Sequence, residues 1–263
     1  MGHIRVGRLP KTKGWKQVIS LFDSVDSTSS EIAAATARAA KEFFAKKRTD
    51  PGLVFSYWIA TQITVSARSD DFVARLKEIG LDISKVENSL DFLSTVASFT
   101  RAQTKLRGAT FPLSDFAQLS LREVLTESIG QQSESLFGTT REDIKLACRK
   151  YSTPQQFSRL ARLYFTKVLN RTLQFFITKE SLNRVGAGRK FEDISHLSEF
   201  DRTLESYCYQ SAKIVEEFAK GWYSKRNWEG EISEHDAKGF VAVAIDKLRA
   251  EIAREDQPKE GEE

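Results

Sequence analysis

The chain has 263 residues, of which 40% are hydrophobic and 29% charged, and its formal net charge is +4 at pH 7. This composition is typical of a globular protein and argues against a disordered or fibrous chain. The most apolar stretch, residues 53–67, is shorter than a membrane-spanning helix and contains Gln62. The basic N-terminus is not followed by the apolar region of a secretory signal. We therefore expect a soluble, cytoplasmic protein with no membrane span.

Residues 1–22 are predicted to form a basic N-terminal arm, because glycines and Pro10 interrupt any regular element near its start. Cations combined with a tryptophan are typical of a segment that becomes ordered on a partner. We predict that six residues of this arm bind a partner: Arg5, Arg8, Lys11, Lys13, Trp15 and Lys16. Two alternatives stay open. The arm contacts a nucleic-acid backbone, or it folds back as a strand-like segment over its own core.

Residues 23–185 are predicted to form a helical body, because helix-capping signals recur along them. Thr28 and Glu31 form a capping box, and Asp50 followed by Pro51 gives an N-cap with proline at the first helical position. The helix after Pro51 is apolar on nearly all sides and should lie centrally in the core. The predicted helices cover residues 28–47, 50–68, 69–80, 84–106 and 120–137, followed by one that starts at Thr139.

The longest predicted helix begins at Thr153 and Pro154, the strongest start signal in the chain, and runs to about Val185. Its apolar residues recur at helical spacing from Phe157 to Phe176 and form one broad stripe. Because this stripe is wider than the seam of a coiled coil, the helix should pack into a globular core with more than one neighbour.

The C-terminal third contains a predicted connecting loop, residues 186–198, and a predicted pair of helices within residues 199–253. The two helices cover roughly residues 199–225 and 233–255. Residues 254–263 are acidic and nearly free of apolar side chains, so they are predicted to form a disordered acidic tail. The elements together predict an all-α fold, an irregular multi-helix bundle of about eight to ten helices.

The charge is distributed unevenly along the chain. Residues 141–190 carry twelve basic and three acidic side chains, a net charge of +9, whereas residues 191–263 carry a net charge of −8. Such an asymmetry bears on partners rather than on fold. We predict a face that binds phosphate or an acidic partner, formed by Arg141, Lys145, Arg149, Arg159, Arg162, Arg189 and Lys190. The alternatives are that this face meets solvent, or the acidic C-terminal part of the same chain.

The sequence contains no recognisable catalytic or metal-binding motif, so we assign no catalytic residue, no metal ligand and no cofactor. His235 lies between two acidic residues at a predicted helix start, a pattern typical of a surface capping cluster. The glycines at 186 and 188 lack the spacing of a phosphate-binding loop and follow a helix rather than a strand. Cys148 and Cys208 stand alone in apolar stretches and are predicted to be buried free thiols in a reducing compartment.

These observations support three hypotheses about function. The first is a non-enzymatic helical scaffold or adaptor subunit of a larger cytoplasmic assembly, which meets a protein partner through its basic arm and basic face. The alternative is a nucleic-acid-binding protein that grips backbone phosphates through the same face, with strongly salt-dependent affinity. The third is an enzyme with a dispersed site, which a polar pocket with perturbed carboxylates would indicate. The sequence does not indicate an oligomeric state.

Overall fold

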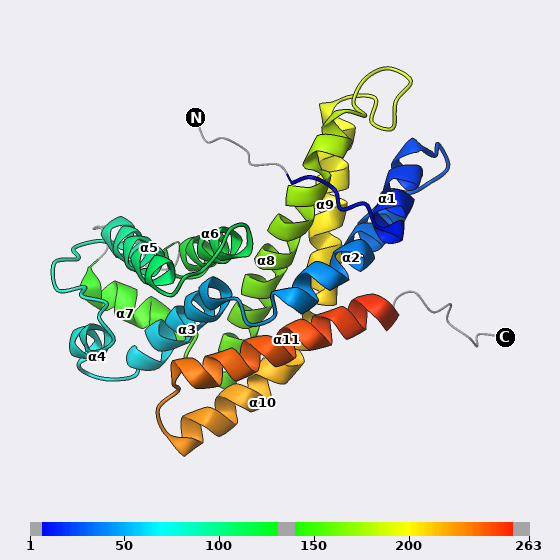
Figure 1. The fold of residues 1–263 in the computed structure, drawn as a ribbon. Helices are drawn as coiled ribbons and strands as arrows, with labels where there is room; N and C mark the ends of the chain where they lie inside the picture. The colour runs from blue at the N-terminus through cyan, green and yellow to red at the C-terminus, as the bar shows by residue number, and fades with distance from the viewer. Residues whose placement is uncertain (1–6, 131–139, 255–263) are drawn as a thin grey trace.

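The computed structural model describes residues 7–130 and 140–254, and these residues form an all-α multi-helix bundle (Figure 1). The predicted fold class is therefore confirmed. Within the described ranges the chain forms no β-strand, and its one bridge of that kind joins Val185 to Phe191. Arg5 of the predicted arm and residues 255–263 of the predicted tail lie outside the described residues.

The helices follow one another with short connections. In chain order they are α1 (Lys13–Asp23), α2 (Ser29–Lys46), α3 (Pro51–Ser66), α4 (Phe72–Glu78), α5 (Ser89–Leu106), α6 (Leu113–Leu125), α7 (Arg141–Lys150), α8 (Pro154–Leu182), α9 (Ile194–Ser211), α10 (Lys213–Glu229) and α11 (Glu234–Arg254). A π-helical turn, Thr126–Gly130, extends α6.

Helix α8 is the longest of the described helices. It packs against α10, α9, α6 and α2, so that helices from both halves of the chain meet along its length (Figure 1). Its predicted apolar stripe is buried, including Phe157, Tyr164, Phe165 and Phe176. The sequence therefore predicted both the length of this helix and its several neighbours.

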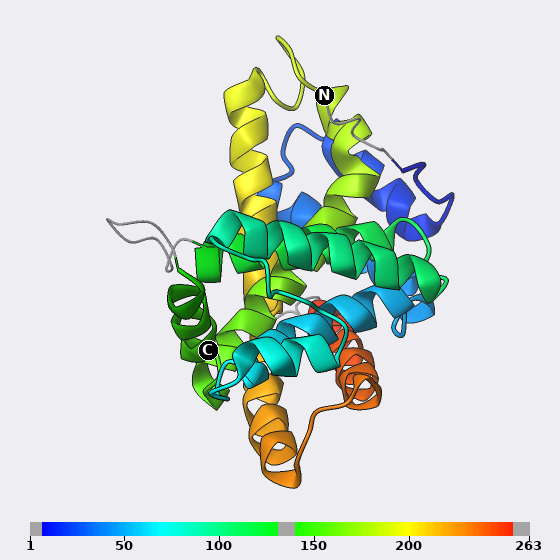
Figure 2. The ribbon, with the colours of Figure 1, turned by 90° about the vertical axis from the view of Figure 1, so that its left-hand side faces the viewer.

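Helix α3 lies centrally, as its uniformly apolar sequence predicted. The Asp50 carboxylate caps it by accepting hydrogen bonds from the backbone N–H groups of Gly52 and Leu53, at 2.9 and 3.2 Å. Burial raises the pKa of Asp50, and these two hydrogen bonds oppose that effect. Helices α4, α5, α6, α7 and α11 all contact α3, and Figure 2 shows the first four gathered around it on one side of the molecule.

One hydrophobic core joins all the described helices. Buried side chains from α1 through α11 belong to a single contiguous cluster, and the core is rich in aromatic pairs. Cys148 and Cys208 are buried in it and form no disulfide.

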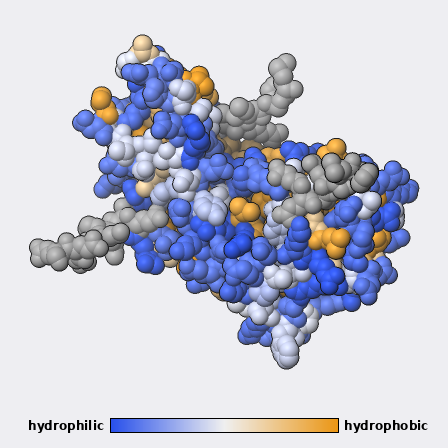
Figure 3. Space-filling model, turned by 180° about the vertical axis from the view of Figure 1, so that it is seen from behind, coloured by the Kyte–Doolittle hydropathy of each residue, from blue (hydrophilic) through white to orange (hydrophobic). Residues whose placement is uncertain are grey.

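Figure 3 shows a mostly hydrophilic surface on the back of the molecule, with hydrophobic side chains in small separate groups. No described helix is both long enough and apolar enough to cross a membrane.

The structure differs from the predicted elements in three places. Residues 13–23 form α1, where an irregular arm was predicted, because Trp15, Val18 and Phe22 recur at helical spacing and are buried against the core. Helix α6 begins at Leu113 after Pro112, well before the predicted start. The predicted helix 199–225 is two helices, α9 and α10, which break at Ala212, and α9 already begins at Ile194, within the predicted connecting loop 186–198.

Two predicted helix starts also shift. Helix α5 is capped by Asn88, whose side chain accepts a hydrogen bond from the N–H of Asp91 at 3.0 Å, and not by Ser84. Helix α7 is capped by Thr140 with Asp143 in the reciprocal position, one residue after the predicted cap. Thr139 lies outside the described residues.

Candidate interaction surfaces

The N-terminal arm divides into a buried side and an exposed side. Trp15, Val18 and Phe22 recur at helical spacing on α1 and are buried. The indole of Trp15 packs on the ring of Phe176, with ring centroids 5.0 Å apart. Trp15 is therefore a core residue that attaches α1 to α8, as the fold-back alternative proposed, although the segment is helical and not strand-like. It is not available on the surface as an anchor for a partner.

The cations of the arm lie on its outer side. Arg8, Lys11, Lys13 and Lys16 are exposed, and none of them forms an ion pair with another described residue. The segment that carries Arg8 is held in place by Gly7, whose N–H donates to the carbonyl of Phe175 at 2.8 Å. A side chain at position 7 would meet the ring of Phe175 at 2.5 Å, so glycine permits this close approach. The backbone that carries the exposed cations is therefore held against α8 by Gly7 and Trp15.

Two of the three cations on the predicted basic face of α7 form hydrogen bonds with backbone carbonyls of the same chain. The Arg141 guanidinium donates to the backbone carbonyls of Val86 and Ser84, at 3.2 and 3.0 Å. The Lys145 ammonium donates to the carbonyl of Asp70 at 3.3 Å, and only 14% of its side chain is exposed. Of the three cations along this line, Arg141 and Arg149 are exposed, and neither forms an ion pair with another described residue. The face therefore anchors α7 to the neighbouring loops.

Arg162 meets the acidic C-terminal part of the chain, one of the alternatives that the sequence left open. Its guanidinium forms an ion pair with Glu216 at 2.9 Å and donates to the carbonyl of Tyr209. It also lies 3.7 Å from the centroid of the Tyr209 ring. Because 11% of the side chain is exposed, this residue joins α8 to α9 and α10 and is not free for another molecule. Arg159, on the same helix, is exposed and has no ion pair to another described residue.

Sequence reasoning missed a cluster of ion pairs around Lys167. The ammonium lies 2.8, 3.2 and 3.1 Å from carboxylate oxygens of Glu123, Glu127 and Glu205. Arg171 also pairs with Glu123. Burial by itself would lower the pKa of Lys167, but hydrogen bonds to Glu123 and Glu205 raise it above the usual lysine range. The sequence showed only that Lys167 lies in a strongly basic segment. It could not show the cluster, because the carboxylates that pair with Lys167 lie on other helical segments.

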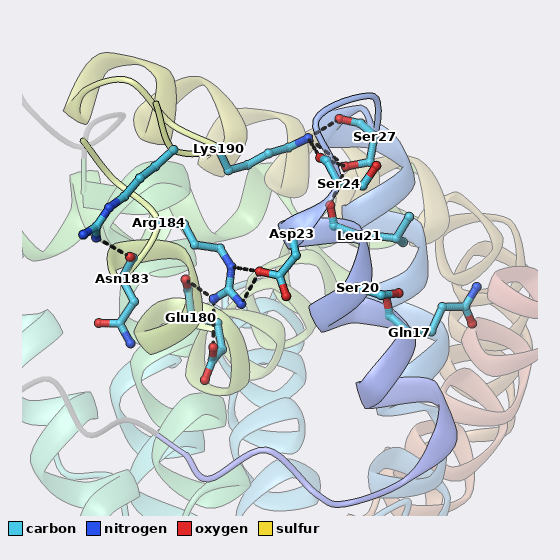
Figure 4. Close-up of polar contacts among 11 residues, drawn as sticks. Gln17, Ser20, Leu21, Asp23, Ser24, Ser27, Glu180, Asn183, Arg184 and Lys190 are labelled. Carbon is cyan, nitrogen blue, oxygen red and sulfur yellow. Dashed lines mark hydrogen bonds and ion pairs between the residues drawn. The ribbon is translucent and has the colours of Figure 1, made fainter. Parts of the chain in front are cut away.

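Hydrogen bonds and ion pairs join the basic loop between α8 and α9, and the end of α8 before it, to the end of α1 and the loop that follows α1 (Figure 4). The Lys190 ammonium donates to the carbonyl of Ser24 at 2.8 Å and to the hydroxyl of Ser27 at 2.7 Å. Beside it, Arg184 pairs with Asp23 at 2.8 Å and with Glu180 at 2.9 Å. Lys190 therefore has an internal structural role.

Arg189, the neighbour of Lys190, is exposed. It donates to the carbonyl of Asn183 at 2.7 Å and forms no ion pair with another described residue. Of the seven cations predicted on the basic face, four thus keep exposed charges without an ionic partner among the described residues: Arg141, Arg149, Arg159 and Arg189. Arg141 and Arg149 lie on α7, Arg159 lies on α8 and Arg189 lies in the loop after α8.

The described residues offer little for metal or nucleophilic chemistry. Among them, no group of three or more His, Cys, Asp and Glu side chains could hold a metal ion. Burial raises the pKa of the Cys148 and Cys208 thiols well above the usual cysteine range, which keeps both protonated and inert. His196 lies beside Asp193 on the surface, where hydrogen bonds from Ser195 and His196 lower the pKa of Asp193 to about 2.

A pocket of about 630 Å³ lies between α6, α8 and α9, next to the Lys167 cluster. Its lining includes the clustered rings of Phe111, Phe116 and Phe175 and the ion-paired side chains of Glu123, Lys167 and Glu205. Burial works to raise the pKa of Glu123, but hydrogen bonds and charge from Lys167 and Arg171 outweigh it and lower that pKa. The perturbed groups are thus paired with one another, an arrangement typical of a structural ion-pair network.

The described residues form an all-α fold built around one long helix, and the exposed cations of the N-terminal segment form no ion pair with another described residue. No family model matches its sequence. Neither a curated protein nor a solved structure matches it.

Proposed function

We propose that this protein is a non-enzymatic helical adaptor in a larger cytoplasmic assembly and binds an acidic protein partner through the exposed cations of its N-terminal segment. The observation that carries the proposal is the arrangement of Arg8, Lys11, Lys13 and Lys16. All four are exposed without an ion pair to another described residue, while Trp15 fixes the same segment to the core. Because the backbone of this segment is already ordered, binding has to order only its side chains, and the exposed cations steer an acidic partner toward the segment.

The basic segment of the sequence supports this choice over a nucleic-acid-binding function. Arg162, Lys167 and Arg184 are each paired with carboxylates of the same chain. Each cation that is already neutralised is one fewer available to displace counterions from a phosphate backbone. Because fewer cations remain to contact phosphates, we favour a protein partner over a nucleic acid.

Two further features fit an adaptor. Trp228 on the last turn of α10 is 91% exposed, and exposed tryptophans are enriched among the residues that dominate protein interfaces. The buried, unbonded thiols of Cys148 and Cys208 suit the reducing environment of the cytoplasm. The ion-paired pocket beside Lys167 gives the enzymatic hypothesis no free acid or base.

The test is a charge-reversed variant, K11E/K13E/K16E, with co-purified proteins compared with those of the native chain by mass spectrometry. Negative charges near the N-terminus of α1 favour the helix dipole, so the variant should fold as the native protein does. A charge-matched control, K85E/K220E/K238E, reverses three exposed lysines elsewhere that form no ion pair with described residues. We expect the arm variant to lose its partner and the control to keep it.

Two results would contradict the proposal. One is an unchanged set of partners for the arm variant. The other is recovery of nucleic acid with the native protein, seen as an absorbance ratio at 260 and 280 nm typical of nucleic acid, that disappears in the arm variant. Deleting residues 1–16 is a poorer test, because it also removes the core contact of Trp15.

A further inference from the structure

A groove of about 420 Å³ runs between α5 and α6. These helices form an antiparallel hairpin, because only residues 107–112 connect them. Both pack on α3, and Figures 1 and 2 show the pair as neighbours at one side of the molecule. All residues that line the groove belong to α5, to α6 or to their connection, so no other described element forms a wall of it.

Much of the floor of the groove is apolar. Its hydrophobic residues are Leu93, Val96, Ala97, Ala109, Leu119, Leu121 and Leu125, and the neutral polar residues Thr100, Thr104, Ser114 and Gln118 also line it. Ala97 is half-buried and Leu119 is 37% exposed, so apolar surface is available to another molecule. Leu90 lies one helical turn before Leu93 on α5 and is 75% exposed, so it adds exposed apolar surface to this helix. An open apolar channel between two helices has the shape that receives a third helix.

The rim of the groove is cationic. Arg101 and Lys105 stand one turn apart on α5, and Arg122 stands on the opposite wall, on α6. All three are exposed, and none forms an ion pair with another described residue. The one acidic residue in the lining, Asp115, already has an interaction of its own. The groove therefore presents a net positive field around an apolar strip.

We propose that this groove binds an amphipathic helix of a partner protein that carries leucine-like side chains on one face and carboxylates along both edges of that face. The apolar face would cover the floor, and the carboxylates would meet Arg101 and Lys105 on one wall and Arg122 on the other. The chain's own acidic C-terminal residues do not suit the groove, because no apolar side chain follows Ala253 to fill its floor. The inference shares with the proposed function the premise of a protein partner, but it concerns a separate surface.

The probe is a synthetic, end-capped peptide of the length of α5, 18 residues, with leucines at helical spacing on one face and glutamates on both flanks. Binding to the full-length protein is followed by fluorescence anisotropy of a label on the peptide. We expect saturable binding that weakens as the salt concentration rises, because the rim charges are exposed to solvent. A second peptide with lysine in place of every glutamate should not bind.

Two variants separate the rim from the floor. R101E/K105E/R122E should weaken binding at least about tenfold, and Ala97→Phe, which fills the groove with an apolar ring, should weaken it similarly. Circular dichroism and thermal unfolding establish that each variant is folded. The charge-matched control K85E/K220E/K238E should bind the peptide as the native protein does, and so should K11E/K13E/K16E. The last comparison makes failure of the groove distinguishable from failure of the arm.

Several outcomes would overturn the proposal. These are no saturation by about 1 mM peptide, equal binding of the lysine peptide, or unchanged affinity of Ala97→Phe, which would mean attraction by charge alone. Competition of a single-stranded oligonucleotide for the peptide, lost in R101E/K105E/R122E, would assign the groove to nucleic acid instead.

Discussion

The ring of Tyr57 on α3 stacks on the ring of Phe240 on α11, with centroids 4.6 Å apart and an interplanar angle of 4°. The pair joins the most central helix of the molecule to its last helix. Trp222 of α10 also approaches Phe240, at 4.7 Å between centroids. The C-terminal helices therefore share their core with the rest of the chain.

Replacing Phe240 by alanine should destabilise the whole protein and not only its C-terminal helices. Loss of a fully buried phenyl ring costs about 3–5 kcal/mol in the free energy of unfolding. Urea unfolding followed by tryptophan fluorescence and by far-ultraviolet circular dichroism should give coincident transitions, both displaced to lower urea concentration. Val243→Ala, which truncates a side chain that is 40% exposed on the same helix, should shift the transitions much less. Two separated transitions in the native protein would show an independent C-terminal unit.

The ion pairs of Glu123 with Lys167 and Arg171 should make stability depend on pH. Because the folded state lowers the pKa of Glu123, its stabilising contribution is present above the ordinary carboxyl pKa and is lost as the pH falls through the folded-state value. Glu123→Gln should therefore cost about 1–2 kcal/mol near pH 7, a value reduced by the partial exposure of the pair. The difference from the native protein should shrink below about pH 4.

Urea titrations at a series of pH values measure this difference directly. Glu142→Gln is a suitable control, because Glu142 lies 3.9 Å from Lys145 and is 67% exposed. It should change stability by a few tenths of a kcal/mol at most. A penalty for Glu123→Gln that stays constant into acid would mean that the carboxylate charge contributes nothing.

Replacing Lys190 by methionine should release the loop between α8 and α9. The substitution replaces the lysine stem by an unbranched side chain one atom shorter and removes the donors to Ser24 and Ser27. The amide groups of Gly186 and Phe191, which bond across this loop, should then exchange with solvent about tenfold faster. Hydrogen exchange measured by mass spectrometry or nuclear magnetic resonance tests this expectation.

Lys179→Met provides the comparison, because Lys179 is exposed on the last turn of α8 and forms no ion pair with another described residue. Exchange in the loop should stay unchanged in that variant. Equal exchange rates in the native protein and the Lys190 variant would show that the ammonium is not what holds the two loops together.

Local signals in the sequence predicted most of the helices correctly. The capping box of Thr28 and Glu31, the Asp50 cap and the Thr153 cap all start helices as expected. These signals work because the bonds that they predict are between neighbours in the chain. Ser120 has the same pattern as a cap, yet it is buried in the middle of α6. Its apolar neighbours are part of a longer buried stripe that begins at Leu113.

The basic surfaces show where sequence reasoning stopped. It identified Arg162, Lys190 and Arg149 as members of one face, and the structure gives them three different roles. Arg162 forms an ion pair with Glu216, Lys190 donates a hydrogen bond to the carbonyl of Ser24, and Arg149 keeps an exposed charge. The groove on α5 and α6 gave no sequence signal at all, because its walls come from two helices whose spacing and tilt no local pattern encodes.

The sequence by itself determined the fold class, the long central helix, the buried thiols and the amount of charge of each sign, because each depends on composition or on contacts within a few turns. Only the tertiary structure decided which cations are neutralised and which stay exposed. Ionic pairing depends on distances of a few ångströms between side chains that lie tens of residues apart, as Lys167 and Glu205 do. Those distances exist only once the helices have packed.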